Sequence, residues 1–380
     1  MKKDKYPVYI IAHNPNTIAE VDKVLAAGVN GLEPDVQYNE QTKDLCMSHF
    51  APGMPDDPPC VETYLQHVKE QLERYPALSL ILFDIKLDQQ EYNSISIADW
   101  GKKLYQTVNS ILGDSGLVII YSVSKKEQAG IFAGFGQWLG KKEALMIDEE
   151  SDVEEVIRTL QSFSTDGSAN IAYADGIAKF IPELNIPEHI QAALSRRALK
   201  TQPRFIGTWV LAQQDAVLRY LRLGVDGMIV SYDSIPHAIE TVQATEFSDR
   251  LRLGERTDNP FDNGMLIYGL EITTADEMLA GTDALIHCTM RFREGTIDFS
   301  IDGDFRNVFG KDSVTRVAVK VPDFGPPISI SLSHNGSGIA PQWLPATVRI
   351  FEGTTQFDVS VNFGEWIGKG DVHTRQLESN

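Results

Sequence analysis

The chain contains only three cysteines in 380 residues, Cys46, Cys60 and Cys288. That number excludes a small fold built on several disulfides. Cys46 and Cys60 flank the segment that carries His49, so a bond between them would staple that segment. The sequence leaves open whether this bond forms.

Long apolar runs and positive charge are also scarce. No run approaches the about 20 apolar residues that span a bilayer, so we expect no transmembrane segment. The start, MKKDKYPVYII, has too short an apolar stretch for a signal peptide, although a secreted protein whose leader has been removed would look the same. We expect a secreted protein, with a cytoplasmic one as the alternative. A net charge of −19 disfavours nucleic acid and strongly anionic membranes, and suits a divalent cation or a zwitterionic headgroup.

The first 250 residues alternate short apolar runs with amphipathic stretches. The phrases LAAGVNGLEPDV and LRLGVDGMIVSY each contain a helix end, a glycine, a tight turn and the next strand. Eight such units predict a closed parallel (β/α)8 TIM barrel, and an open doubly wound sheet is the alternative. The predicted strands are residues 8–13, 31–36, 78–86, 116–123, 143–148, 170–175, 204–210 and 227–232.

The pattern changes after GERTDNPFDNG. From about residue 265 the apolar runs are short and β-like, with turns at EGT, DGD, GPP, NGSG and EGTT. This pattern predicts a smaller antiparallel β-sandwich. We therefore expect a barrel domain over residues 1–261 and a sandwich domain over residues 265–380.

Side chains that can bind a metal ion or transfer a proton lie at the ends of the first three predicted barrel strands. His13 ends the first strand, Glu33 and Asp35 end the second, and the third ends with Asp84 and Lys86. The carboxyl ends of barrel strands face the mouth in which active sites form. Since side chains alternate along a strand, Glu33 and Asp35 share a face. Any one of these residues alone would be interpreted as a cap or a surface charge. The whole set at the ends of three consecutive strands indicates a shared functional site.

Three carboxylates in one mouth repel one another unless a cation lies among them. Oxygen ligands of this kind suit Mg²⁺, with Ca²⁺ as the alternative. His13 and His49 fit acid and base roles beside such an ion, because imidazole titrates near neutral pH. Lys86 would then hold a phosphate oxygen.

The stretch IIAHNPNTIAEVDKVLAAGVNGLEPDVQY, then His49, then LILFDIKL, resembles the sphingomyelinase D/phospholipase D toxins of sicariid spiders and their bacterial and fungal relatives. These proteins are a branch of the glycerophosphodiester phosphodiesterase-like barrels. The resemblance covers residues 6–261 and implies that His13 and His49 are catalytic. It also implies that Glu33, Asp35 and Asp84 bind Mg²⁺ and that Lys86 contacts the phosphate. RLRLGERTDNPF resembles the tail motif that closes the barrel, with DNPF in place of DNPW.

Other positions depart from this family's pattern. Trp209 is similar to the Trp that lines the headgroup pocket, with plain barrel packing as the alternative. Gly207 stands where a Tyr is common, and Ser231 stands where the toxins carry Asn. The headgroup is therefore less well specified than the metal and acid–base chemistry.

The carboxyl-terminal segments LAGTDALIHCTMRF and VPDFGPPISISLSHNGSGIAPQWLPATVRIF resemble a PLAT (LH2-type) sandwich. Such domains usually dock lipid enzymes onto lipid or protein. Trp343 and Trp366 are candidate membrane-touching tips, but we expect each to be sandwich core.

These features predict a Mg²⁺-dependent phospholipase D-type enzyme that releases choline or ethanolamine from sphingo- or lysophospholipids and leaves a cyclic phosphate. The sandwich would meet a zwitterionic membrane. A hydrolytic glycerophosphodiester phosphodiesterase is one alternative, although its usual His-Arg-Gly and His-Asp signatures are replaced by AHNPN and SHF. A non-catalytic lipid-binding protein is the other.

Overall fold

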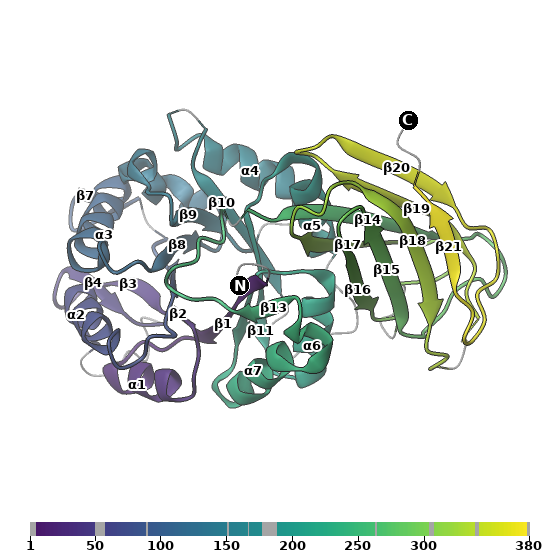
Figure 1. The fold of residues 1–380 in the computed structure, drawn as a ribbon. Coiled ribbons are helices and arrows are strands. Elements are labelled where there is room, and N and C mark those ends of the chain that lie inside the picture. The colour runs from purple at the N-terminus through teal and green to yellow at the C-terminus, as the bar shows by residue number, and fades with distance from the viewer. Residues whose placement is uncertain are drawn as a thin grey trace.

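A closed barrel and a β-sandwich lie side by side in the computed structural model (Figure 1). The structure describes residues 5–49, 58–88, 90–149, 152–165, 167–176, 188–262, 264–303, 308–338 and 342–377. Within these ranges, no helix is long and apolar enough to cross a bilayer.

The barrel has eight parallel strand positions, and two short consecutive strands, β2 and β3, share one of them. It closes because β1 pairs with both β12 and β2, and β2 pairs in turn with β5. The predicted barrel is therefore confirmed, and the doubly wound alternative is wrong. In order around the barrel, the strands are β1 (Tyr6–His13), β2 (Gly31–Glu33) with β3 (Asp35–Asn39), β5 (Leu80–Ile85), β8 (Val118–Val123), β9 (Glu143–Ile147), β10 (Asn170–Gly176), β11 (Phe205–Leu211) and β12 (Gly227–Val230).

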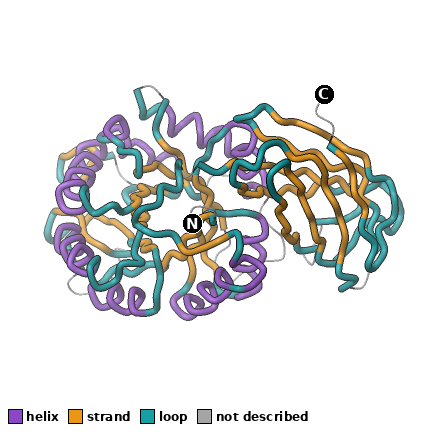
Figure 2. Tube along the Cα trace, viewed as in Figure 1, coloured by secondary structure: helices purple, strands orange, loops and turns teal. Residues whose placement is uncertain are grey.

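Helices surround the strands as an outer ring (Figure 2). Local signals fix their ends: Thr17 and Glu20 form a capping box before the first helix, and Gly224, with a φ of 95°, ends the sixth. The α-helices are α1 (Ile18–Ala26), α2 (Val61–Gln71), α3 (Ile97–Leu112), α4 (Val153–Gln161), α5 (Glu188–Lys200), α6 (Gln214–Leu223), α7 (Ile235–Gln243) and α8 (Thr245–Ser248). Short 3₁₀ turns are η1 (Lys126–Gly134), η2 (Gly136–Trp138) and η3 (Tyr232–Ser234).

Alternate residues of the barrel strands fill its interior. The inner cluster includes Tyr9, Ile11, Leu82 and Ile120, and Phe261 from the segment after the last barrel helix packs against them. Near the same segment, the buried amide of Asn30 donates to the carbonyl oxygen of Gly254. The barrel is thus filled with side chains below its mouth, as expected for this fold.

The predicted strand over residues 31–36 is interrupted at Pro34, which has no N–H to donate to a neighbouring strand. The chain continues as β3, which forms an antiparallel hairpin with β4 (Asp44–Met47). The apolar pattern of the sequence did not predict β4. Nor did it predict β13 (Leu251–Leu253), which pairs with β1, or the small hairpin of β6 (Glu91–Tyr92) and β7 (Ile95–Ser96).

The second domain is the predicted antiparallel sandwich. One sheet has the order β17-β14-β19-β20 and the other β16-β15-β18-β21. Trp343 is fully buried in the hydrophobic core, as expected, whereas Trp366 is 42% exposed and does not belong to the core. The strands are β14 (Leu266–Thr274), β15 (Ile286–Phe292), β16 (Thr296–Ile301), β17 (Val314–Val321), β18 (Pro327–His334), β19 (Pro345–Glu352), β20 (Phe357–Asn362) and β21 (His373–Gln376).

The sandwich packs directly against helices α5 and α6 of the barrel (Figure 1). Glycines allow the close approach: a Cβ on Gly224 would lie 2.1 Å from the carbonyl oxygen of Ala318. At the same place Lys320 of β17 enters the barrel wall and donates to Asp226 (2.6 Å) and to the carbonyl oxygen of Val225 (3.1 Å).

Asp226 is the centre of a buried charge cluster. Its carboxylate also accepts from Tyr6 Oη (2.5 Å) and from the Arg197 guanidinium, and all four side chains are buried. Burial opposes its ionisation, but Arg197 and Lys320 hold the pKa of Asp226 below its ordinary value. We call Tyr6, Arg197, Asp226 and Lys320 the interdomain cluster.

Candidate active site

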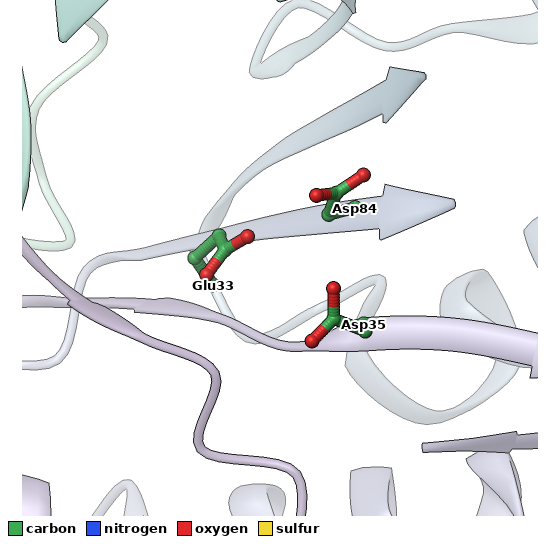
Figure 3. Close-up of side chains that lie close together, drawn as sticks. All are labelled: Glu33, Asp35 and Asp84. Atoms are coloured by element: carbon green, nitrogen blue, oxygen red, sulfur yellow. The ribbon is translucent and has the colours of Figure 1, made fainter. Parts of the chain in front are cut away.

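Three carboxylates from two neighbouring strand positions, β2 with β3 and β5, converge at the carboxyl ends of the barrel strands. Glu33 ends β2 beside His13 of β1, and Asp35 begins β3 in register with Asp84 of β5. One oxygen from each of the three carboxylates lies within 4.8 Å of the others. Figure 3 shows the three groups turned toward a common space. We call Glu33, Asp35 and Asp84 the mouth cluster.

The mouth cluster carries unfavourable electrostatics. Burial, together with the charges of Asp35 and Asp84, raises the pKa of Glu33 well above its ordinary value. Burial also raises the pKa of Asp84, although the neighbouring Lys86 acts to lower it. Within the described residues, Oδ1 of Asp35 and Oδ1 of Asp84 are buried and accept no hydrogen bond. Buried oxygens without a donor are costly, and the single ammonium of Lys86 does not match the charge of three carboxylates.

Two asparagines hold these carboxylates in place. Asn16 donates its amide to Asp35 Oδ2 (2.8 Å) and accepts from the Asp35 backbone N–H (2.8 Å). The Asn14 backbone N–H donates to Glu33 Oε2 (3.0 Å). Asn14 adopts a φ of 53°, a left-handed conformation that asparagine tolerates better than most residues. The AHNPN segment therefore orients the mouth cluster.

His13 and His49 flank the cluster, with ring centroids 6.3 Å apart and planes at 73°. His49 Nδ1 lies 3.1 Å from Asp35 Oδ2 and 3.0 Å from the Asn14 side chain. The amide of Asn14 satisfies most groups when its oxygen accepts from His49 and its nitrogen donates to His13 Nε2 (3.2 Å). A neutral His49 then carries its proton on Nδ1, and Nε2 is its basic nitrogen.

Lys86 is the cation nearest the mouth cluster in the described structure. It forms an ion pair with Asp84 and donates to Ser124 Oγ (3.3 Å). Desolvation acts to lower the pKa of Lys86, but Asp84 raises it, and the net direction is upward. Lys86 therefore stays protonated with one side of its ammonium committed to Asp84.

Trp209 reaches the mouth from β11. Its indole N–H donates to the backbone oxygen of Asp148 (3.3 Å), and its ring packs against the inner barrel cluster. Gly176 of β10 makes room for this arrangement, because a Cβ there would lie 1.5 Å from the Trp209 carbonyl oxygen. Both interpretations of Trp209, pocket wall and barrel packing, are compatible with this position.

Asp148 is a site residue that was not predicted from the sequence. It follows β9, is buried, and within the described structure its Oδ1 accepts no hydrogen bond. Burial and the charge of Asp84 raise its pKa well above the ordinary value. Asp148 is the last residue of the predicted strand EALMID (143–148). The rule that selected Asp84, a carboxylate near the carboxyl end of a barrel strand, would therefore also have selected Asp148.

The residues of the mouth cluster fit a hard divalent cation. Three carboxylates supply only oxygen ligands, and the two unpartnered Oδ1 atoms have no other described role. Mg²⁺ and Ca²⁺ both accept such ligands. The structure thus brings together all six charged or imidazole residues predicted from the sequence, while their individual roles stay predictions.

Two family models match this chain. The Dermonecrotic toxin SPH family matches residues 3–261, and the PLAT/LH2 domain matches residues 268–377. A dermonecrotic toxin of Loxosceles spinulosa is 24% identical over 280 residues, which cover 67% of this chain and 98% of the toxin.

Two solved structures align over single domains. A proposed glycerophosphoryl diester phosphodiesterase from Silicibacter pomeroyi aligns with a TM-score of 0.42 and 12% identity, covering 62% of this chain and 93% of that one. A coral 8R-lipoxygenase aligns with a TM-score of 0.26 and 29% identity over 29% of this chain, and the match spans only 16% of the lipoxygenase. The family matches confirm both resemblances inferred from the sequence: the chain belongs to the dermonecrotic toxin SPH family and carries a PLAT/LH2 domain after its barrel.

Proposed function

We propose that this protein is a Mg²⁺-dependent phospholipase D-type enzyme that releases choline or ethanolamine from sphingo- or lysophospholipids. One observation carries the proposal: three buried carboxylates without a matching positive charge lie between two histidines at a barrel mouth. Membership of the dermonecrotic toxin family supports the same chemistry. We further propose that the protein is secreted, since the relatives it matches are toxins.

The nucleophile in this proposal is the lipid's own hydroxyl. Its oxygen attacks the phosphorus, the bond from phosphorus to the headgroup oxygen breaks, and a cyclic phosphodiester remains. An internal nucleophile has effective molarities that reach ~10⁵ M or more when well oriented. His13 or His49 takes the hydroxyl proton, and the other histidine protonates the leaving alkoxide. The 6.3 Å between their ring centroids supports this, because it is short enough for both rings to reach one phosphate.

Charge on the phosphoryl oxygens needs positive partners. Bound Mg²⁺, held by Glu33, Asp35 and Asp84, would supply Lewis-acid stabilisation of that charge. Lys86, which stays protonated beside Asp84, donates to a phosphoryl oxygen with the part of its ammonium that Asp84 does not occupy. Asn14 and Asn16 keep the carboxylates and histidines in register during the reaction.

The hydrolytic phosphodiesterase alternative predicts a different product. Water would attack the phosphorus, and a linear phosphomonoester would form. We favour the cyclic product because the Arg of the hydrolytic His-Arg-Gly signature is absent: Asn14 and Pro15 follow His13. The third possibility, a lipid-binding protein without activity, is disfavoured because the complete set of candidate residues is assembled.

The test is a ³¹P NMR assay in ¹⁸O-water with sphingomyelin and lysophosphatidylcholine. We expect an initial cyclic phosphodiester without solvent oxygen, and no reaction in excess EDTA. A labelled linear phosphomonoester from the earliest time point would establish the hydrolytic alternative. No turnover of any choline or ethanolamine lipid would favour the binding protein.

We also propose that the catalytic unit spans residues 1–261 and that residues 265–380 dock it on a zwitterionic lipid surface. Exposed apolar residues gather on loops at one end of the sandwich: Met278 is 84% exposed, Leu279 78% and Trp366 42%. Backbone bonds link these loops, since Leu344 donates to Ala280 and the neighbouring Trp343 pairs with Ile367.

Vesicle sedimentation tests this docking. Phosphatidylcholine vesicles should retain less of a Leu279→Asp, Trp366→Ala double variant than of the wild type. The matched control is Trp138→Ala, which removes a similarly exposed Trp from the barrel side. Equal retention of all three proteins would remove this role from the sandwich.

A further inference from the structure

We propose that Cys46 and Cys60 form a disulfide that joins β4 to the start of α2, on either side of the segment that carries His49. Cys46 lies in β4, and Cys60 immediately precedes α2. The two residues are directly opposed in an isolated antiparallel bridge. Both are thiols in this structure.

The hydrogen bonding around this bridge shows whether the two cysteines form a hydrogen-bonded or a non-hydrogen-bonded antiparallel pair. The N–H of Met47 donates to the carbonyl oxygen of Pro59 (2.9 Å). This bond joins the residue after Cys46 to the residue before Cys60, so the cysteines occupy a non-hydrogen-bonded position. At such a position the two Cα atoms lie about 4.5 Å apart and both side chains project from the same face. A disulfide accepts Cα separations of about 4.4–6.8 Å, so the backbone is already in place for the bond.

The two thiols differ in access. Cys46 is buried, whereas Cys60 is exposed and its Sγ lies 3.1 Å from Thr63 Oγ1. Burial, with the charges of Asp44 and Cys60, raises the pKa of Cys46 to about 11. An oxidant from solvent therefore meets Cys60 first, and Cys46 is the resolving residue.

The oxidant is a low-molecular-weight disulfide, such as oxidised glutathione. The Cys60 thiolate attacks one of its sulfurs and releases one glutathione thiol. The Cys46 thiolate then attacks the Cys60 sulfur and releases the second glutathione. Two electrons pass to the oxidant, and the two cysteine protons end on the two glutathione thiols.

The bond would fix both ends of the segment over residues 47–59. At its first end, the Ser48 N–H donates to the carbonyl oxygen of Asp35 (3.1 Å), and His49 Nδ1 lies against the Asp35 side chain. A clamp at Cys46 therefore acts two and three residues from these contacts. Cys288 is buried in the sandwich, and burial raises the pKa of its thiol, so it serves as an internal reference.

Thiol counting on the full-length protein tests the proposal. The protein is incubated with oxidised glutathione, denatured, alkylated with N-ethylmaleimide and weighed intact. Of the three cysteines, one should be alkylated, and after dithiothreitol treatment all three should be. Trypsin should yield one peptide over residues 44–69, and cyanogen bromide cleavage at Met47 and Met54 should leave its two cysteine fragments joined.

Single variants give the matched controls. Cys46→Ser and Cys60→Ser should show no redox-dependent melting shift, whereas the wild type and Cys288→Ser should melt at least about 3 °C higher when oxidised. If the function proposed above holds, dithiothreitol should also lower kcat in the wild type but not in Cys46→Ser. Thiol counting needs no activity, so it separates the two proposals. Three alkylated thiols in the oxidised wild type, or a bond that involves Cys288, would overturn the disulfide.

Discussion

The molecule contains two buried carboxylate clusters with opposite charge balance. In the mouth cluster, three carboxylates share one neighbouring ammonium, Lys86, and the pKa of Glu33 is raised. In the interdomain cluster, a single carboxylate, Asp226, meets an ammonium, a guanidinium and a phenol, and its pKa is lowered. In the interdomain cluster, two cationic side chains neutralise the one carboxylate, so we expect this cluster to stabilise the fold without a bound ion. In the mouth cluster, carboxylates outnumber the neighbouring ammonium, so we expect their repulsion to oppose folding until a cation binds, as in many functional sites.

The largest effect should come from removing a mouth carboxylate. Asp35→Asn should lower kcat/KM for headgroup release at least about 10³-fold, because loss of the cation removes several kcal/mol of transition-state stabilisation. The metal-free variant should be at least as stable as the wild type, since repulsion is relieved. Kinetics and urea denaturation in EDTA check both statements. Asp44→Asn, an exposed carboxylate on β4, is the control, and equal activity in the two variants would contradict the assignment.

Asp226→Asn should have the largest effect on stability. It leaves Arg197 and Lys320 buried without a counter-charge, which we expect to lower the free energy of unfolding by about 3–5 kcal/mol. Urea denaturation followed by circular dichroism measures the loss. An unchanged midpoint would show that the interdomain cluster does not stabilise the fold.

The two clusters should respond to pH in opposite directions in the metal-free protein. The folded state binds the Glu33 proton more tightly than the unfolded chain, so this group's contribution to stability falls as pH rises from the ordinary glutamate pKa toward the raised value. Asp226 has a lowered pKa, so its contribution is present above the ordinary aspartate pKa and is lost as pH falls through the lowered value.

Melting temperatures in EDTA across acidic and neutral pH check these signs. Glu33→Gln should flatten the decline on the neutral side, and Asp226→Asn should flatten the loss on the acid side. Parallel curves for the two variants would contradict the comparison.

The smallest effect should come from Lys320→Met. Asp226 would keep Arg197, Tyr6 and the Ile206 N–H as partners, and burial already lowers the pKa of Lys320 to about 7. Replacing a buried ammonium with an apolar side chain of similar length should change the free energy of unfolding by less than about 1 kcal/mol. A loss as large as that of Asp226→Asn would make Lys320 the main stabilising partner.

The mouth cluster could be predicted from the sequence because period-two alternation and strand ends are local patterns. Glu33 and Asp84 needed only the positions of their strands. The sequence did not predict Asn14 as a link between His13 and His49, because that role depends on a left-handed backbone and on contacts between separate segments.

The interdomain cluster could not be predicted at all. Tyr6, Arg197, Asp226 and Lys320 are separated by up to 314 residues, and Lys320 comes from the sandwich while the other three come from the barrel. Each residue alone has the pattern of an ordinary core or surface position. The sequence indicated two domains, but the way they pack is decided by side-chain fit, such as Gly224 against Ala318.

Calorimetric titration of Mg²⁺ into the metal-free protein tests the central claim most directly. We expect one ion per wild-type chain, with proton release that appears as a dependence of the heat on buffer ionisation enthalpy, because the cation displaces a proton favoured by the raised pKa of Glu33. Asp226→Asn should still bind under conditions in which it is folded, and Asp35→Asn should not. If the wild type binds no Mg²⁺, or if Asp35→Asn binds it equally well, the mouth cluster is not the metal site.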